Sequence, residues 1–222
     1  MKIAVLGTGV VGNTIGTKLI QLGHQVKMGS RASKNEKAIA WVKTAGSNAS
    51  EGSFADAAAF GEIIFNCTSG QGSLDALKAA GDANLNDKIL IDISNPLDFS
   101  KGMPPSLSIV NTDSLGESIQ RTFPKVKVVK TLNTMTCYIM VDPSLVPGDH
   151  NVFVSGNDEE AKDKVKEILK SFGWKANNIL DMGDITTARG TEQLLPIWIR
   201  LWGKLQNPMF NFNINIGPAP KK

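Results

Sequence analysis

The first 31 residues, MKIAVLGTGVVGNTIGTKLIQLGHQVKMGSR at positions 1–31, decide the fold of this chain. Residues Lys2 to Leu6 form a short apolar run, which is typical of a buried parallel strand. A glycine-rich turn follows, and the apolar spacing from about Val11 to Leu22 predicts a helix that ends at Gly23. A second strand is expected at about Gln25 to Met28. The stretch therefore predicts a strand–turn–helix–strand unit.

The turn from Gly7 to Gly12 has the spacing G-x-G-x-x-G. Between a strand and a helix this spacing is typical of dinucleotide binding. Gly7 permits the tight turn, Gly9 lets a pyrophosphate approach the backbone, and Gly12 lets the helix pack against the strand. The N–H groups and the dipole at the helix start favour phosphates. A glycine turn without a ligand is the alternative, and the complete strand–helix–strand context argues against it.

The end of the second predicted strand indicates which dinucleotide binds. A site for NAD usually has Asp or Glu about 20 residues after the glycines. This chain has Ser30 and Arg31 there, with Lys34 just beyond, and the next carboxylate is Glu36. A 2′-phosphate needs hydrogen-bond donors and positive charge, which Ser30, Arg31 and Lys34 can supply. The pattern predicts NADP(H); the alternative is that Arg31 and Lys34 only solvate the start of a helix.

Composition excludes several classes of function. The chain has 222 residues, of which 41% are hydrophobic and 20% charged, as is typical of a soluble globular protein. A net charge of +3 without long basic runs argues against nucleic acid binding. Cys67 and Cys137 are far apart and form no C-x-x-C pattern, which predicts reduced thiols in the cytoplasm and no metal site. The first strand leaves no room for a signal peptide, and the stretch Leu194 to Leu205 is too short and too charged to span a membrane.

Strand-like and helix-like segments alternate along the rest of the chain. Further strands are expected within Gly46–Ser53 and at Glu62–Cys67, Lys88–Ile93, Lys125–Leu132, Val152–Ser155 and Asn178–Leu180. Further helices are expected at Lys34–Thr44, Phe54–Phe60, Ser73–Ala80, Leu115–Phe123, Ala161–Phe172 and about Ile185–Gln206. The alternation predicts an α/β fold: a Rossmann-type, doubly wound, mostly parallel sheet with a small C-terminal helical extension.

The chain is expected to divide near residue 184. Residues 1–184 would form the NADP-binding domain, and residues 185–222 a C-terminal helix and tail on the substrate side or at a subunit contact. Because Leu, Ile and Trp occupy more than one face of this last helix, we expect it to be buried against the sheet and a second subunit. Residues Ser100 to Ser108, with two adjacent prolines, are expected to form a surface loop.

Ligands of doubly wound sheets lie beyond the carboxyl ends of the strands. The loop after the fourth expected strand offers Thr68 and Ser69 to the cofactor ribose or phosphates, and the loop after the fifth offers Asn95 to the nicotinamide half. Ordinary turn chemistry explains these residues equally well. The loop after the sixth strand, Asn133 to Cys137, is expected on the same side.

The usual acid–base groups of dehydrogenases have no counterpart in this sequence. His24 is expected on the side of the sheet away from the ligand, and His150 lies in a Pro/Gly loop. The only tyrosine, Tyr138, is not part of a Tyr-x-x-x-Lys pair, and G-x-S-x-G and H-E-x-x-H are both absent. The catalytic residues therefore stay unassigned. An NADP enzyme without such groups suggests hydride transfer to a conjugated redox ring that needs little help with protons.

Four segments are similar to the F420-dependent NADP oxidoreductase family, which is related to the NADPH-binding domains of the STEAP metalloreductases. They are Gly7–Arg31, Val128–Thr134, Phe153–Lys162 and Ala188–Trp202. The resemblance implies a homodimer that exchanges hydride between NADPH and a small-molecule acceptor such as F420 or a flavin. It implies that the pyrophosphate lies at Thr8, Gly9, Val10 and Val11, that the 2′-phosphate lies at Ser30, Arg31 and Lys34, and that the nicotinamide lies near Asn133, Met135 and Cys137.

The chain departs from the family in one loop. Archaeal F420 enzymes tend to carry a histidine and a proline where Asn133 and Thr136 stand here. The NADP site is unaffected by this difference, but the acceptor stays open among F420, a flavin and a quinone. Two other functions are considered: an NADPH-dependent imine or carbonyl reductase, for which the C-terminal helical segment is short, and a non-catalytic NADPH-binding regulatory module.

Overall fold

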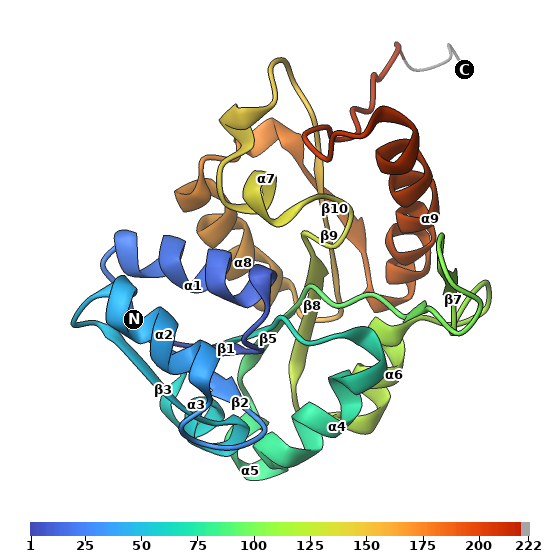
Figure 1. Cartoon of the computed structure of the whole chain (residues 1–222). Helices are drawn as coiled ribbons and strands as arrows, with labels where there is room; N and C mark the ends of the chain where they lie inside the picture. The colour runs from blue at the N-terminus through green and yellow to red at the C-terminus, as the bar shows by residue number, and fades with distance from the viewer. Residues whose placement is uncertain (219–222) are drawn as a thin grey trace.

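A computed structural model describes residues 1–218. Its centre is an eight-stranded sheet in the order β10-β9-β8-β5-β4-β1-β2-β3, with helices on both faces (Figure 1). The strands are β1 (Lys2–Leu6), β2 (Gln25–Ser30), β3 (Ala49–Ser53), β4 (Ile63–Asn66), β5 (Ile89–Asp92), β8 (Lys127–Thr131), β9 (Val152–Gly156) and β10 (Ile179–Gly183). Neighbouring strands are parallel except that β9 runs antiparallel to β8. The predicted mostly parallel Rossmann-type fold is confirmed.

Two layers of helices cover the sheet. One face carries α1 (Val10–Gln21), α2 (Glu36–Ala45), α7 (Cys137–Val141) and α8 (Glu159–Phe172). The other carries α3 (Phe54–Phe60), α4 (Gly70–Ala80), α5 (Asp82–Leu85) and α6 (Leu115–Thr122). The last helix, α9 (Ala188–Leu205), packs against α6 and follows a short 3-10 helix, η3 (Ile185–Thr187). Two further 3-10 turns are η1 (Pro143–Leu145) and η2 (Ala176–Asn178).

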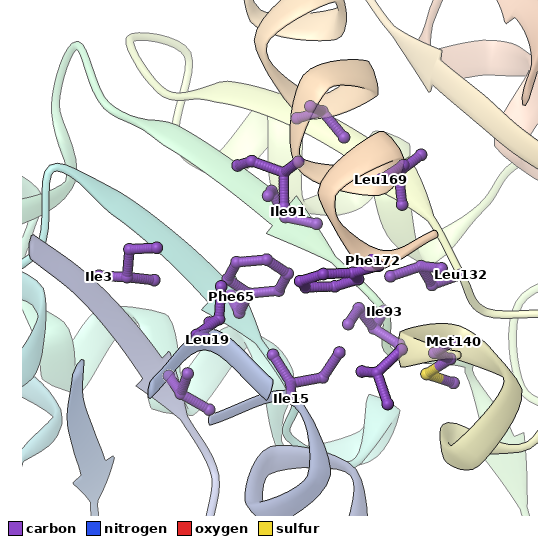
Figure 2. Packing of buried hydrophobic residues seen from close by; sticks show 14 of the residues in the cluster. Ile3, Ile15, Leu19, Phe65, Ile91, Ile93, Leu132, Met140, Leu169 and Phe172 are labelled. Atoms are coloured by element: carbon purple, nitrogen blue, oxygen red, sulfur yellow. The ribbon is translucent and has the colours of Figure 1, made fainter. Parts of the chain in front are cut away.

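Strand β1 shows how the sheet separates two apolar cores. Ile3 and Val5 belong to the core beneath α1 and α8, whereas Ala4 and Leu6 belong to the core beneath α3 and α4. Side chains of a strand alternate between faces, so a strand covered on both faces must be apolar throughout. In Figure 2, Phe65 of β4 lies against Phe172 of α8, with ring centroids 6.5 Å apart. This packing explains why residues 3–6 of β1 and 63–65 of β4 are continuous apolar runs.

The structure corrects the sequence-based boundaries in three places. Strand β2 continues to Ser30, two residues beyond the expected end, so that Ser30 lies at the sheet edge where ligands bind. The segment Ser100–Ser108, expected to be a loop, ends in one strand of an antiparallel hairpin formed by β6 (Leu97–Asp98) and β7 (Ser106–Leu107). The short helices α5 and α7 were not expected, because four or five residues are too few to show a helical period.

Helix α9 is amphipathic in the single chain, so its expected contact with a second subunit stays a prediction. Its inner face buries Trp198 and its neighbours, but Ile197, Trp202 and Leu205 are 50%, 42% and 56% exposed. The chain after α9 folds back, and Phe210 stacks on Trp198 with ring centroids 5.4 Å apart. The end of the predicted C-terminal segment, residues 219–222, lies outside the described residues. Within residues 1–218, none of the helices has the length and apolar character needed to cross a membrane.

Candidate functional site

Two adjoining cavities lie where the parallel strands end at their carboxyl side. The larger has a volume of about 570 Å³ and is bounded by the loops after β1, β2 and β4. The smaller has a volume of about 280 Å³ and is bounded by the loops after β4 and β5. The two cavities share Cys67, Thr68 and Ser69 in their walls. Their position agrees with the rule that ligands of doubly wound sheets bind beyond the strand ends.

The glycine turn at the larger cavity has the geometry expected from its spacing. Gly7 has φ +117°, and a Cβ there would lie 2.6 Å from the Cys67 carbonyl oxygen. A Cβ on Gly12 would lie 2.1 Å from the Gly7 carbonyl oxygen. Both glycines are therefore required by the packing of the turn itself. A Cβ on Gly9 would have no heavy atom within 4 Å, so the backbone of Gly9 faces open space at the cavity.

Two helices begin at these cavities without a side-chain cap. Helix α1 begins after Gly9 and α4 after Ser69, and neither has a capping hydrogen bond or an acidic residue in its first turn. By contrast, α2, α3, α6 and α8 are each capped by a side-chain oxygen. The first N–H groups of a helix have no partner within the helix, and together with the dipole they favour an anion. The uncapped ends are therefore suited to phosphate oxygens.

The expected 2′-phosphate residues are only partly brought together. Ser30 and Arg31 line the larger cavity, whereas Lys34 lies outside both cavities. The backbone N–H of Lys34 donates to the Glu51 carboxylate of β3 at 2.9 Å, a neighbour that the sequence did not indicate. The Ser30 hydroxyl donates to the Ala32 carbonyl and would have to rotate before it could donate to a phosphate. Arg31, at the exposed rim, is the residue best placed to offer several donors.

The Thr68 hydroxyl is held in a closed ring of hydrogen bonds. It donates to Asn66 Oδ1 at 2.6 Å, and it lies 2.9 Å from the Ser73 hydroxyl. Asn66 Nδ2 in turn donates to Ser73 at 3.0 Å. Because its proton is committed to Asn66, Thr68 can accept a hydrogen bond from a ribose hydroxyl but cannot readily donate one to a phosphate.

Asn95 and Asn133 form a reciprocal pair between the loops after β5 and β8. Asn95 Nδ2 donates to the Asn133 carbonyl, and Asn133 Nδ2 donates to Asn95 Oδ1, both at 2.9 Å. Asn95 lines the smaller cavity and Asn133 is buried behind it. The loop after β4 also contacts this pair, because a Cβ on Gly70 would lie 1.9 Å from the Asn95 carbonyl oxygen. The three loops thus form one rigid wall.

Three further candidate residues, Val10, Met135 and Cys137, lie outside the walls of both cavities. Met135 and Cys137 belong to the buried core beside α1, and the Thr14 hydroxyl donates to Cys137 Sγ at 3.6 Å. Val10 is exposed at the first position of α1, outside both cavity walls, whereas Val11 lines the smaller cavity. Their predicted contacts with a cofactor stay predictions.

Cys67 differs from Cys137 because it lies between the two cavities. Burial, and next the charge of Asp92, raise the pKa of the Cys67 thiol, which keeps it neutral. A neutral thiol is a weak nucleophile. Cys67 therefore contributes packing and shape, and not an anion, to the site.

A buried ionic cluster beneath the smaller cavity was missed by sequence reasoning. Lys130 Nζ, at the end of β8, lies 2.8 Å from Asp92 Oδ2 of β5 and 2.8 Å from Glu192 Oε1 of α9, and it also donates to the Ser94 carbonyl. Burial alone would lower the pKa of Lys130, but the charges of Asp92 and Glu192 outweigh it and raise that pKa above the ordinary value. The available signal was a charged residue near the carboxyl end of each of two strands, Asp92 in ILID and Lys130 in KVVKT.

Further residues line the cavities without having been named as candidate site residues, and they come from helices, strands and loops. In the larger cavity these are Asn35, Phe54, Gly72, Asp75, Ala76 and Ala79, and in the smaller cavity Gly70, Gln71, Ile93, Ser94, Leu97 and Phe99. Nothing in their local sequence distinguishes them from ordinary helix, strand and loop residues. Only the packing of α3, α4 and the β6–β7 hairpin around the strand ends brings them to the cavities.

The family model described as "NADP oxidoreductase coenzyme F420-dependent" matches residues 2–96. A crystal structure from Arthrobacter sp. FB24, provisionally described as an F420-dependent NADP reductase, is 55% identical with a TM-score of 0.93 and covers 97% of this chain and 100% of its own. The chain belongs to this family of NADP-dependent oxidoreductases. Its two cavities thus occur in a protein of a family that is described as NADP oxidoreductases.

Two curated relatives of this NADP oxidoreductase extend the comparison. The F420-dependent NADP reductase of Methanocaldococcus jannaschii is 29% identical over 213 residues, which cover 90% of this chain and 92% of that protein. The metalloreductase STEAP3 of Rattus norvegicus is 29% identical over 205 residues, and the match spans only 38% of its length. Solved imine reductases, such as the Myxococcus stipitatus enzyme at 14% identity and a TM-score of 0.63, share the fold alone.

Proposed function

We propose that this protein transfers hydride between NADP(H) and a planar redox ring of the flavin or deazaflavin (F420) class. The observation that supports a ring acceptor is the chemistry of the smaller cavity. None of the residues that line it is Asp, Glu, Lys, Arg, His or Tyr. Reduction of a carbonyl or an imine needs a proton donor within hydrogen-bond reach, and this wall offers only neutral hydroxyl, thiol and amide side chains, which are weak acids.

The proposed arrangement places the two halves of NADP(H) in the two cavities. The adenosine and pyrophosphate would lie along the glycine turn and Arg31, and the nicotinamide would lie beside Asn95. Leu97 and Phe99, from the β6–β7 hairpin, add apolar surface to the nicotinamide side. An acceptor ring that stacks there needs mainly proximity and orientation, because the cofactor carries the redox chemistry.

The acceptor is tested by following NADPH oxidation with F420, FMN, FAD, quinones and cyclic imines. Turnover with a flavin or deazaflavin and not with an imine supports the proposal. Turnover with cyclic imines alone refutes it in favour of an imine reductase. Tight NADPH binding without turnover of any acceptor refutes it in favour of a regulatory binding module.

The preference for NADP(H) is tested with Arg31→Ala. A charge-assisted bidentate contact contributes about 1.5–3 kcal/mol, so loss of Arg31 should weaken NADPH binding by roughly 10- to 100-fold and leave NADH binding nearly unchanged. Lys43→Ala is the matched control, because Lys43 is an exposed cation of α2 that lies outside both cavities. An unchanged NADPH/NADH ratio in Arg31→Ala would show that another group selects the phosphate.

We also propose that the outer face of α9 pairs with a second copy of the chain. Ile197, Trp202 and Leu205 are exposed there, next to a groove of about 370 Å³ that α9 forms with Met103 and Pro104. Exposed apolar patches of this kind are typical of subunit contacts. Trp202→Glu should convert a dimer to a monomer in light scattering, whereas Val110→Glu, at an exposed apolar residue outside α9, should not. A monomeric wild type refutes this proposal.

A further inference from the structure

The cluster beneath the smaller cavity contains one ammonium and two carboxylates. Lys130, Asp92 and Glu192 come from β8, β5 and α9, and all three side chains are almost completely buried. A buried charge is costly unless partners compensate for it. The charge state of the two carboxylates therefore decides the electrostatic potential that the cluster creates.

Hydrogen-bond donors surround the carboxylate of Asp92. Its Oδ1 accepts from Asn66 Nδ2 at 2.8 Å and from the Ser94 hydroxyl at 2.6 Å. Its Oδ2 accepts from Lys130 Nζ at 2.8 Å. These bonds, together with one from the Ser94 backbone N–H to Oδ1 at 3.2 Å, are all donated to the carboxylate by its neighbours. An ionised carboxylate is an acceptor only, so this set of donors matches the ionised form of Asp92.

The carboxylate of Glu192 has the same type of surroundings. Its Oε1 accepts from Lys130 and from the Gly116 backbone N–H at 3.0 Å, and its Oε2 accepts from the Leu115 N–H at 2.8 Å. The two backbone donors belong to the start of α6, where the helix dipole also favours an anion. These donors match an acceptor-only carboxylate, and with both carboxylates charged the cluster carries one more negative charge than positive.

This excess charge lies next to the smaller cavity. Ser94, whose hydroxyl donates to Asp92 and whose carbonyl accepts from Lys130, is itself part of the cavity wall. No side chain in that wall carries a compensating positive charge. The negative potential of the cluster thus extends into the space where the nicotinamide ring would lie.

We infer that the Lys130–Asp92–Glu192 cluster makes the site favour oxidised over reduced nicotinamide, with Glu192 as a specificity-determining residue for the redox state. The inference rests on the proposed function, because it places the nicotinamide in the smaller cavity. The NADP⁺ ring carries a positive charge that NADPH lacks, and reduction adds two electrons and one proton to it. At an effective dielectric constant near 20, a unit charge about 12 Å away changes an equilibrium constant by roughly tenfold.

The test measures the dissociation constants of NADP⁺, NADPH and adenosine 2′,5′-bisphosphate by calorimetry for wild type and Glu192→Gln. Glutamine keeps the size of the side chain and removes one negative charge. The ratio Kd(NADP⁺)/Kd(NADPH) should rise by about three- to tenfold, and the adenosine bisphosphate, which has no nicotinamide, should bind equally well to both proteins. A tenfold change raises the potential of the bound couple by about 30 mV.

The matched control is Glu117→Gln. Glu117 pairs with Arg189 at 2.6 Å between the same two helices, but none of its hydrogen bonds reaches Lys130 or the cavity wall. This variant should leave the NADP⁺/NADPH ratio at the wild-type value. If Glu192→Gln does not fold, Asp92→Asn removes the same charge and should raise the ratio in the same direction.

The outcomes separate this inference from the proposed function. Equal weakening of NADP⁺ and NADPH, or no change in their ratio, overturns the redox-state inference and leaves the NADP(H) site intact. An equal rise of the ratio in Glu117→Gln also overturns it, because a general charge effect would then be the cause. Failure of the wild type to bind either nucleotide refutes the proposed function and this inference together.

Discussion

Replacement of Lys130 by methionine should be strongly destabilising. The side chain is completely buried, and its ammonium neutralises Asp92 and Glu192 at 2.8 Å each. Methionine fills similar space but leaves two carboxylates facing each other without a counter-charge. Breaking a buried ion pair by removing one partner costs about 3–5 kcal/mol. For a chain of this size each kcal/mol lowers Tm by about 2–4 °C, so Lys130→Met should lower Tm by roughly 6–20 °C.

The measurement is thermal and urea unfolding followed by circular dichroism at about pH 8 and about pH 5. Without the ammonium, the two buried carboxylates destabilise the folded state only while both are charged. The difference from wild type should therefore shrink as the pH falls into the range where carboxylates take up protons. The control is Lys170→Met, which removes an exposed Lys170–Glu167 pair and should cost no more than about 0.5 kcal/mol at either pH.

Two results would refute this reasoning. A loss below about 1 kcal/mol at pH 8 would mean that the cluster does not behave as a buried ion pair. An equal loss at both pH values would mean that packing, and not charge, explains the effect. The double variant Lys130→Met/Glu192→Gln should recover part of the stability, since it removes one of the two opposed charges.

The remaining predictions concern the turn, an acid-sensitive pair and the tail. Gly9→Ala should keep the fold, because its Cβ meets no atom within 4 Å, but weaken NADPH binding at least tenfold, whereas Gly12→Ala should lower Tm as well. Burial alone would raise the pKa of Asp181, yet hydrogen bonds from Lys166 and other donors lower it to about 2. The stability that the Asp181 carboxylate contributes is therefore present above its unfolded pKa and is lost as the pH falls from about 4 to 2. Acid unfolding should be less steep in Asp181→Asn for this reason. Phe210→Ala, which removes a partly buried ring stacked on a helical tryptophan, should cost about 1–2 kcal/mol in urea unfolding.

Much of the fold follows from the sequence alone. The apolar run of β1, the helical apolar pattern of α1 and the close contact of Gly12 with Gly7 depend on neighbours along the chain, and so the β1–α1–β2 unit could be predicted closely. The position of Ser30 and Arg31 near the ligand could also be predicted, because the carboxyl end of a strand lies at the ligand-binding edge of a parallel sheet. The family match over residues 2–96 supports NADP(H), whereas the roles of Ser30 and Arg31 stay predictions.

Only the tertiary structure decided which distant residues meet. The order of the strands brings Asp92 beside Lys130, and the packing of α9 on α6 then adds Glu192 to them. On the other face, the packing of α7 beside α1 buries Cys137 in the core, although its position after a strand suggested a place at the cofactor. Local sequence determines helices, strands and turns because their hydrogen bonds and sterics are short-range. Partners across the sheet depend on the assembly of the whole chain, and in this protein they set the charge beneath the candidate nicotinamide cavity.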